Sequence, residues 1–92
     1  MSEVNIVITE VFSVEEASDF RENVRNHMDN GVNQFLLDFR DCRFIDSTGL
    51  GVIVGLYKRS AEIGGGIKLK SLNPNVRKVF DLTRLTNIFE IV

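Results

Sequence analysis

The feature that most constrains the fold is a regular alternation of short strand-like runs with longer segments of helical spacing, all within 92 residues. The strand-like runs occupy residues 4–8, 34–39, 67–72 and 87–92, and a helical pattern separates each run from the next. Such alternation predicts right-handed crossovers and a mostly parallel sheet with helices packed on it. We therefore expect an α/β fold and, from the length, a single domain over residues 1–92.

The segment after the first run carries the clearest helix signals. Ser13 followed by Glu16 is the sequence signature of a capping box at a helix start. Gly31 stands where a glycine would end a helix of this length. The apolar residues between these two signals recur at spacings of three and four and form one stripe, which we expect to face the core. The members of this stripe are Val14, Ala17, Phe20, Val24 and Met28.

The later segments are marked in the same way. The run at 34–39 is almost continuously apolar, which predicts a strand covered on both faces. Residues 67–72 alternate apolar side chains with lysines, which predicts a half-covered or edge strand. Two further helices are predicted, one from Leu50 to the glycines at 64–66 and one starting at Asn73 and Pro74. Their expected core stripes are Ile53, Val54, Tyr57 and Ala61, and then Val76, Val79, Phe80 and Thr83.

Composition excludes several classes of partner and environment. The net charge is −2 and no basic block occurs, which argues against nucleic acid as a partner. The single cysteine, Cys42, cannot form an internal disulfide, so we expect a reducing compartment. The longest run of glycine and apolar residues, 49–57, is shorter than the roughly 20 residues that cross a bilayer, and no signal peptide is recognisable. We expect a cytoplasmic protein without membrane insertion.

The sequence contains no convincing catalytic constellation. A hydrolase nucleophile elbow would need glycine at Ile45, and a catalytic triad would have to use the only histidine, His27. The glycines at 49, 51 and 55 do not have the spacing of a dinucleotide-binding loop. Three aspartates near a strand end lack the further ligands that a divalent ion needs: Asp38, Asp41 and Asp46. We therefore expect a protein that is not an enzyme and that has no cofactor and no metal site.

Asp46, Ser47 and Thr48 stand at the entrance of the apolar segment 49–57. The side chain of Asp46 or Ser47 can accept a free N–H group at the start of the second helix, which stabilises the helix by about 1 kcal/mol. Two glycines of this segment, Gly49 and Gly51, would let the helix approach the sheet closely. Farther along, Val52, Gly55 and Leu56 lie off the core stripe and Arg59 follows by one turn, which predicts an exposed patch for contact with another protein.

The segment "LLDFRDCRFIDSTGLGVIVGLYKRSAEIGGGIKL", followed by "NPNVRKVFDLTRLTNIFEI", resembles the STAS domain of bacterial anti-sigma factor antagonists. The resemblance implies that an anti-sigma factor with serine kinase activity phosphorylates Ser47, with Asp46 as its acidic neighbour and Thr48 as the second candidate. It also implies that the unphosphorylated protein binds the anti-sigma factor and thereby frees the sigma factor. Phosphorylation would end this binding, and a serine phosphatase would reverse the modification.

The expected partner-binding residues belong to the same motif and the turns after it: Gly49, Leu50, Gly51, Val52, Gly55, Leu56 and Arg59. Compared with the family pattern, the chain lacks the usual first strand and last helix, which favours a homodimer or a partner that covers the sheet edge. The alternative function is a STAS accessory or scaffold subunit of a stressosome-like complex or of a membrane transporter.

Overall fold

Parallel strands form the framework on which the helices are arranged. The computed structural model describes residues 3–92. Its main sheet contains, in spatial order, β1 (Glu3–Val7), β3 (Gln34–Asp38), β5 (Gly66–Lys70) and β6 (Glu90–Ile91), with every neighbouring pair parallel. A second parallel pair consists of β2 (Val11–Phe12) and β4 (Phe44–Ile45). The prediction of a mostly parallel α/β fold is confirmed.

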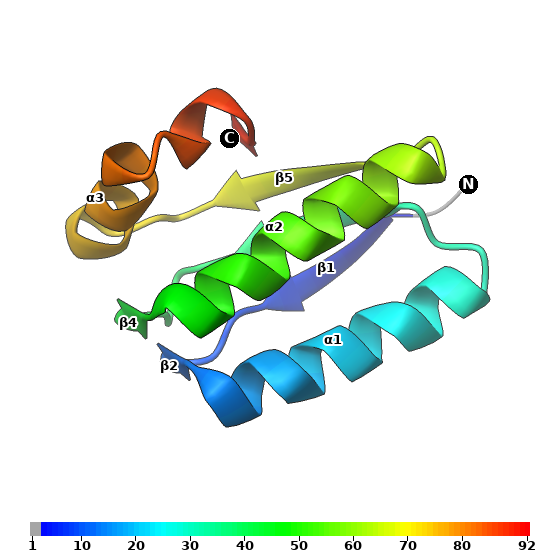
Figure 1. Cartoon of the computed structure of the whole chain (residues 1–92), viewed down its shortest axis with the longest axis horizontal. Coiled ribbons are helices and arrows are strands. Elements are labelled where there is room, and N and C mark those ends of the chain that lie inside the picture. Colours follow the sequence, from blue (N-terminus) through cyan, green and yellow to red (C-terminus); the bar gives the residue numbers. More distant parts are fainter. Residues whose placement is uncertain (1–2) are drawn as a thin grey trace.

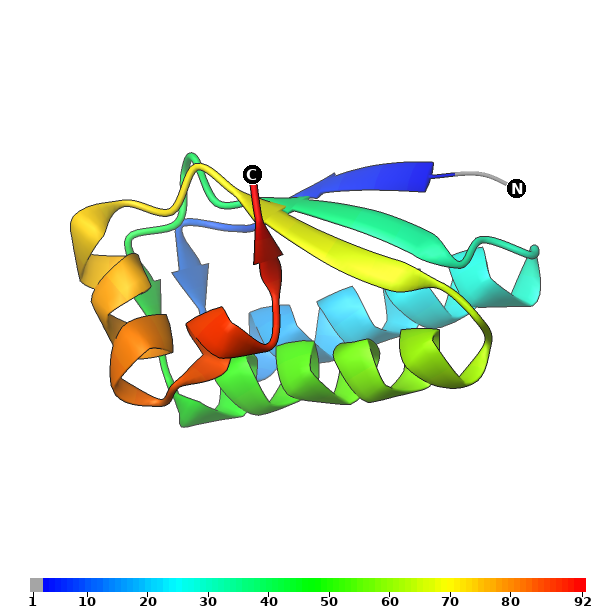
Figure 2. The same cartoon turned by 90° about the horizontal axis from the view of Figure 1, so that it is seen from above.

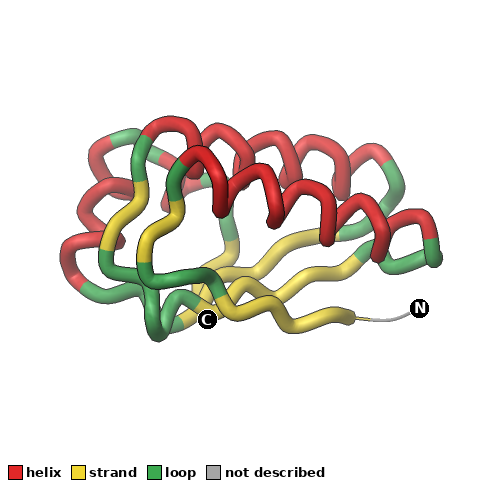
Figure 3. The backbone as a smooth tube through the Cα atoms, turned by 90° about the horizontal axis from the view of Figure 1, so that it is seen from below, coloured by secondary structure: helices red, strands yellow, loops and turns green. Residues whose placement is uncertain are grey.

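The helices lie on one face of the main sheet (Figure 2). They are α1 (Val14–Asp29), α2 (Ser47–Glu62) and α3 (Pro74–Leu82), followed by the short 3₁₀ helix η1 (Leu85–Asn87). Helices α1 and α2 run in the same direction and pack side by side along their lengths (Figures 1 and 3). Each of these two helices follows directly from one strand of the small sheet, so both begin at the same end of the molecule (Figure 1).

The predicted start and stop signals of the helices hold in the structure. The Glu16 carboxylate accepts the backbone N–H of Ser13 at 3.1 Å, which is one half of a capping box. Gly31 has a φ of +87°, a left-handed conformation that favours glycine, and its N–H donates to the Met28 carbonyl. The Asn73 side chain accepts the N–H of Val76 at 2.9 Å, and Pro74 occupies the first position of α3.

The core lies between the main sheet and its one layer of helices. Phe35 and Leu37 of β3 point toward the helices and are fully buried, whereas Leu36 between them is half-buried. The prediction that this strand is covered on both faces was therefore wrong. Aromatic rings fill much of the core in edge-to-face pairs, such as Phe12 with Phe20 at 5.2 Å between ring centroids.

Several element-level predictions need correction. Strands β2 and β4 were not predicted, because a two-residue strand leaves no periodic pattern to detect. Strand β5 is half-covered as expected, but it lies inside the sheet between β3 and β6. Three members of the expected core stripes are exposed: Val14 at the first position of α1, Ala61 near the end of α2, and Thr83 just after α3.

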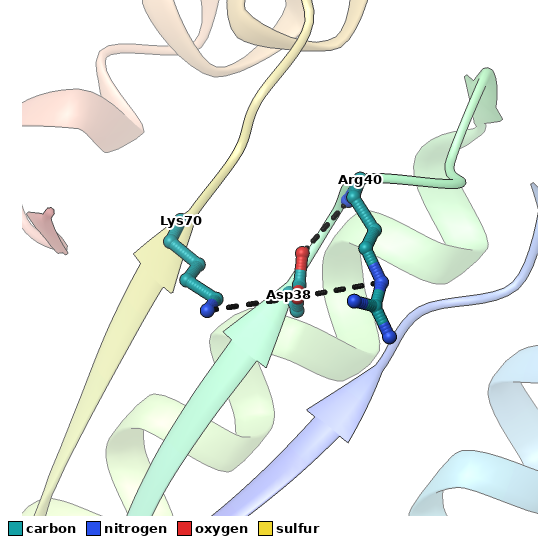
Figure 4. Close-up of polar contacts among 3 residues, drawn as sticks. All are labelled: Asp38, Arg40 and Lys70. Carbon is teal, nitrogen blue, oxygen red and sulfur yellow. Dashed lines mark hydrogen bonds and ion pairs between the residues drawn. The ribbon is translucent and has the colours of Figure 1, made fainter.

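A buried acidic side chain marks the carboxyl end of β3. Only 8% of the Asp38 side chain is exposed, and it forms ion pairs with Arg40 Nε at 3.6 Å and with Lys70 Nζ at 3.8 Å (Figure 4). Its Oδ1 atom also accepts the backbone N–H of Arg40 at 2.9 Å (Figure 4). Burial of a carboxylate is tolerated when charges and donors of this kind surround it. Asp38 therefore has a structural role, tying the end of β3 to β5 and to the loop after it.

Candidate functional site

The candidate site is the point where the two long helices begin. The chain leaves β2 and enters α1 through Ser13, and it leaves β4 and enters α2 through Asp46. The pairing of β2 with β4 brings these two capping residues together. The Ser13 hydroxyl donates a hydrogen bond to Asp46 Oδ2 and so joins two residues that lie 33 positions apart. This contact was not predicted, because the sequence pattern assigns Ser13 only to the start of its own helix.

Asp46 is held in one orientation by two donors. Its Oδ1 atom accepts the N–H of Gly49 at 2.9 Å, which confirms the predicted cap of α2, while Oδ2 accepts the Ser13 hydroxyl. The Ser13 hydroxyl, and after it the Gly49 amide, lower the pKa of Asp46 below its ordinary value, since both donors favour the ionised carboxylate. At neutral pH the site therefore carries a fixed negative charge immediately before Ser47.

Ser47 and Thr48 are the first two residues of α2, and both are exposed. Ser47 lies one helical turn before Gly51, and Thr48 lies one turn before Val52. Both hydroxyls are therefore presented at the outer start of the helix, next to the fixed carboxylate of Asp46. The backbone N–H groups at a helix start favour a negative charge in this position.

Gly49 is buried because α2 approaches β2 at this residue. A methyl group added to Gly49 would lie 2.3 Å from the carbonyl oxygen of Phe12 and 2.7 Å from its ring. A methyl group added to Gly51 would meet open space, so the prediction that both glycines serve close packing holds for Gly49 and is wrong for Gly51. Leu50, another predicted partner-binding residue, is half-buried against the core.

The prediction of an exposed aliphatic patch on α2 was wrong. Leu56 is only 6% exposed and belongs to the core, and Val52 is half-buried against it. The buried face of α2 is formed by residues at spacings of four and three, namely Gly49, Ile53, Leu56 and Ser60. This face includes Leu56 because α2 packs against two neighbours, the sheet and helix α1.

Five of the predicted partner-binding residues nevertheless come together in one groove between α1 and α2, with a volume of about 520 Å³. On the α2 side it is lined by Gly51, Val52, Gly55, Leu56 and Arg59. On the α1 side it is lined by Arg21, Val24, Arg25, Met28 and Asp29. The groove begins one turn after the Ser47 and Thr48 hydroxyls, so the two parts of the predicted site are continuous along α2.

An exposed apolar pair at the helix starts was missed. Val11 and Phe44 face each other in the register of β2 and β4, and they are 45% and 53% exposed. Phe44 lies three positions before Ser47, and together with Val11 it adds exposed apolar surface next to the segment that carries the two hydroxyls. Single sequence signals could not have revealed it, because the pair exists only through the contact between β2 and β4.

The other candidate groups have separate surroundings. Among residues 3–92, no three His, Cys, Asp or Glu side chains come close enough together to hold a metal ion. The Cys42 thiol is buried, and its burial raises its pKa, so the thiol stays protonated at neutral pH. In the same range of residues, none of the helices combines the length and apolar character that crossing a membrane requires.

Comparison with known proteins extends these observations to a family. The chain is 42% identical over 52 residues to the anti-sigma-B factor antagonist of Bacillus subtilis, an alignment that covers 56% of this chain and 48% of that protein. It is 34% identical over 73 residues to the anti-sigma F factor antagonist of Paenibacillus polymyxa, covering 74% of this chain and 62% of that protein. The chain thus spans less than two thirds of the length of these two curated relatives, and both carry the names of regulatory proteins.

The fold is shared with solved structures. The solution structure of the Thermotoga maritima protein TM1081 superimposes with a TM-score of 0.89 at 33% sequence identity, covering 98% of this chain and 73% of that one. The family model for the STAS domain matches residues 5–92, which includes the end of β1 and the whole of α1 as well as the segment that carried the resemblance. The chain belongs to the STAS domain family.

Proposed function

We propose that the chain acts as an anti-sigma factor antagonist whose binding is controlled by phosphorylation of Ser47. The observation that carries this proposal is the exposed Ser47 hydroxyl at the first position of α2, directly after a carboxylate fixed by two hydrogen bonds. The names of the Bacillus and Paenibacillus relatives support the same function. The chain would be the substrate of a serine kinase and a serine phosphatase, and its partner would place it in the cytoplasm.

A phosphate on Ser47 is compatible with the fold. It would add a charge of about −1.5 to −2 at the start of α2, where the helix dipole and free N–H groups favour an anion. Ser47 is exposed, so the phosphate would displace none of the buried side chains that hold α2 on the sheet. The modification would therefore act on the binding surface and leave the fold unchanged.

The same phosphate would be unfavourable in an interface. The surface around Ser47 contains the exposed apolar pair Val11 and Phe44 and the already negative Asp46. A partner that covers this surface in the unphosphorylated state would have to bury a new dianion beside an existing carboxylate. The cost of desolvation and of like-charge repulsion would release the partner.

Mass spectrometry after incubation with a candidate anti-sigma factor and ATP tests this proposal. The expected result is one added phosphate on Ser47 and loss of the complex as phosphorylation proceeds. The Ser47→Ala variant should accept no phosphate, whereas the matched Thr48→Ala variant should be modified like the wild type. Phosphate on Thr48 alone would show that Thr48 is the acceptor. The proposed function would be refuted if no candidate anti-sigma factor modified the chain or formed a complex with it.

A further inference from the structure

The groove between α1 and α2 differs in charge from the rest of the molecule. The whole chain has a net charge of −2, yet the groove is lined by three arginines and one aspartate. Arg21 and Arg25 project from consecutive turns of α1, and Arg59 lies on the α2 side. Arg59 is 3.8 Å from Glu62, whereas Arg21 and Arg25 form no ion pair within residues 3–92.

The base of the groove has a flat, open segment on α2. Gly51 and Gly55 are one turn apart and exposed, and a methyl group added to either glycine would contact nothing within 4 Å. Glycine in the middle of an exposed helix lowers helix stability by about 0.5–1 kcal/mol relative to alanine. Within residues 3–92, no packing contact requires these two glycines, and their bare helix surface allows the close approach of another backbone.

The apolar residues beside the glycines complete an amphipathic surface. Val52 on α2 and Met28 on α1, both half-buried, supply the accessible apolar part of the lining, and the buried Leu56 and Val24 lie beneath them. The lined stretch of α2 from Gly51 to Arg59 is a little over two helical turns, or about 12 Å long. These dimensions match a helix that lays one apolar face into a groove.

We infer that this groove binds an acidic amphipathic helix of the partner protein. Apolar side chains of that helix pack on Val52 and Met28, its backbone approaches Gly51 and Gly55, and its carboxylates pair with Arg21 and Arg25. Guanidinium groups suit this role because they form paired hydrogen bonds with carboxylates. The inference rests on the proposed function, because the helix is assigned to the same anti-sigma factor that is released on phosphorylation of Ser47.

The test uses synthetic helical peptides and the isotope-labelled chain in nuclear magnetic resonance titrations. One peptide has about four helical turns, a leucine face and flanking glutamates, and its control carries lysine at every glutamate position. The expected result is binding of the acidic peptide alone, with shifts centred on the amides of Gly51, Gly55 and Arg25. The Arg21→Glu/Arg25→Glu variant should weaken binding by at least about tenfold, or about 1.4 kcal/mol.

Two variants serve as matched controls. Lys68→Glu/Lys78→Glu changes the net charge by the same amount on β5 and α3 and should leave the affinity for the acidic peptide unchanged. Gly55→Leu should raise the melting temperature and yet abolish binding, a combination that a purely structural glycine would not produce. Equal binding of the lysine peptide, binding away from the groove, no binding up to about 1 mM, or self-association of the chain through this groove would overturn the inference.

Failure of this inference can be distinguished from failure of the proposed function. If the acidic peptide does not bind but an anti-sigma factor still phosphorylates Ser47, the function stands and the groove assignment is wrong. If the peptide binds at the groove but Ser47 accepts no phosphate from any candidate kinase, the groove binds an acidic helix of the predicted kind while the phosphorylation switch and the assignment of that helix to an anti-sigma factor are both wrong.

Discussion

At the scale of single residues, the site depends on one carboxylate that serves two helices. Asp46 caps its own helix through the Gly49 amide and also accepts the hydroxyl of Ser13, the residue that precedes α1. The carboxylate next to Ser47 is therefore oriented by a contact from a distant part of the chain. A kinase would meet a hydroxyl whose surroundings are already ordered before binding.

The first prediction concerns the pH dependence of stability through Asp46. Because folding lowers the pKa of this group, its ionised form stabilises the fold at every pH above the unfolded-state value of about 3.9. This stabilisation is lost as the pH falls through the lower folded-state pKa. The Asp46→Asn variant should therefore have a lower melting temperature than the wild type at pH 7, and the difference should shrink below about pH 4.

Thermal unfolding followed by circular dichroism between acidic and neutral pH would measure this difference. Ser13→Ala removes the larger cause of the pKa shift and should reproduce part of the effect. A constant difference between wild type and Asp46→Asn at all pH values would contradict the assigned role of the carboxylate charge.

At the scale of elements, two of the three glycines in α2 have opposite effects on packing. A methyl group at Gly49 would meet the Phe12 carbonyl at 2.3 Å, whereas a methyl group at Gly51 would meet nothing within 4 Å. Gly49→Ala should lower the free energy of unfolding by about 1–3 kcal/mol through overpacking. Gly51→Ala should raise it by about 0.5–1 kcal/mol through helix propensity. Urea denaturation of both variants checks that the two changes in the free energy of unfolding have opposite signs. Destabilisation by Gly51→Ala as well would contradict the open space beside Gly51.

The position of Leu56 decides which side of α2 belongs to the core. Leu56→Ala should lower the free energy of unfolding by about 2–5 kcal/mol, because a buried leucine leaves a cavity. Leu82→Ala provides the matched control, since Leu82 is also a helical leucine but is 74% exposed, and it should change stability by less than about 0.5 kcal/mol. Chemical denaturation measures the free energy of unfolding of the two variants. Equal losses for Leu56→Ala and Leu82→Ala would contradict the burial of Leu56.

At the scale of the whole molecule, the fold separates the proposed phosphorylation site from the core. The helices lie on one face of the sheet (Figure 2). Ser47 is exposed at the first position of α2, whereas the core side chains are buried between these layers. A charge added at this point can alter a binding surface without rearranging the strands or helices. This arrangement is compatible with the proposed control of binding by phosphorylation of Ser47.

Ser47→Asp tests that separation. The variant should keep the circular dichroism spectrum of the wild type, with a change in the free energy of unfolding below about 1 kcal/mol, because the new charge lies at a helix start. It should also fail to capture the anti-sigma factor in a pull-down experiment, with Ser47→Ala as the binding-competent control. Loss of the native spectrum would instead indicate a switch that acts by refolding.

Much of the fold could be predicted because its signals are local. The capping residues Ser13, Asp46 and Asn73 and the stop at Gly31 each act within a few positions along the chain, and all appear in the structure as predicted. The same holds for the phosphorylation candidate Ser47, whose exposed place at a helix start follows from its position after the cap. Its role as an acceptor remains a prediction.

The sequence by itself determined the alternation of the four main strands with the three long helices, the caps at the helix starts and the motif that carries the family resemblance. Only the tertiary structure decided that the helices cover one face of the sheet, that Leu56 is buried, and that Ser13 reaches Asp46. The physical reason is that helical periodicity identifies residues sharing a face but not the number of neighbours packed against that face. Contacts such as Val11 with Phe44, and the groove between α1 and α2, arise from docking of segments far apart in the chain.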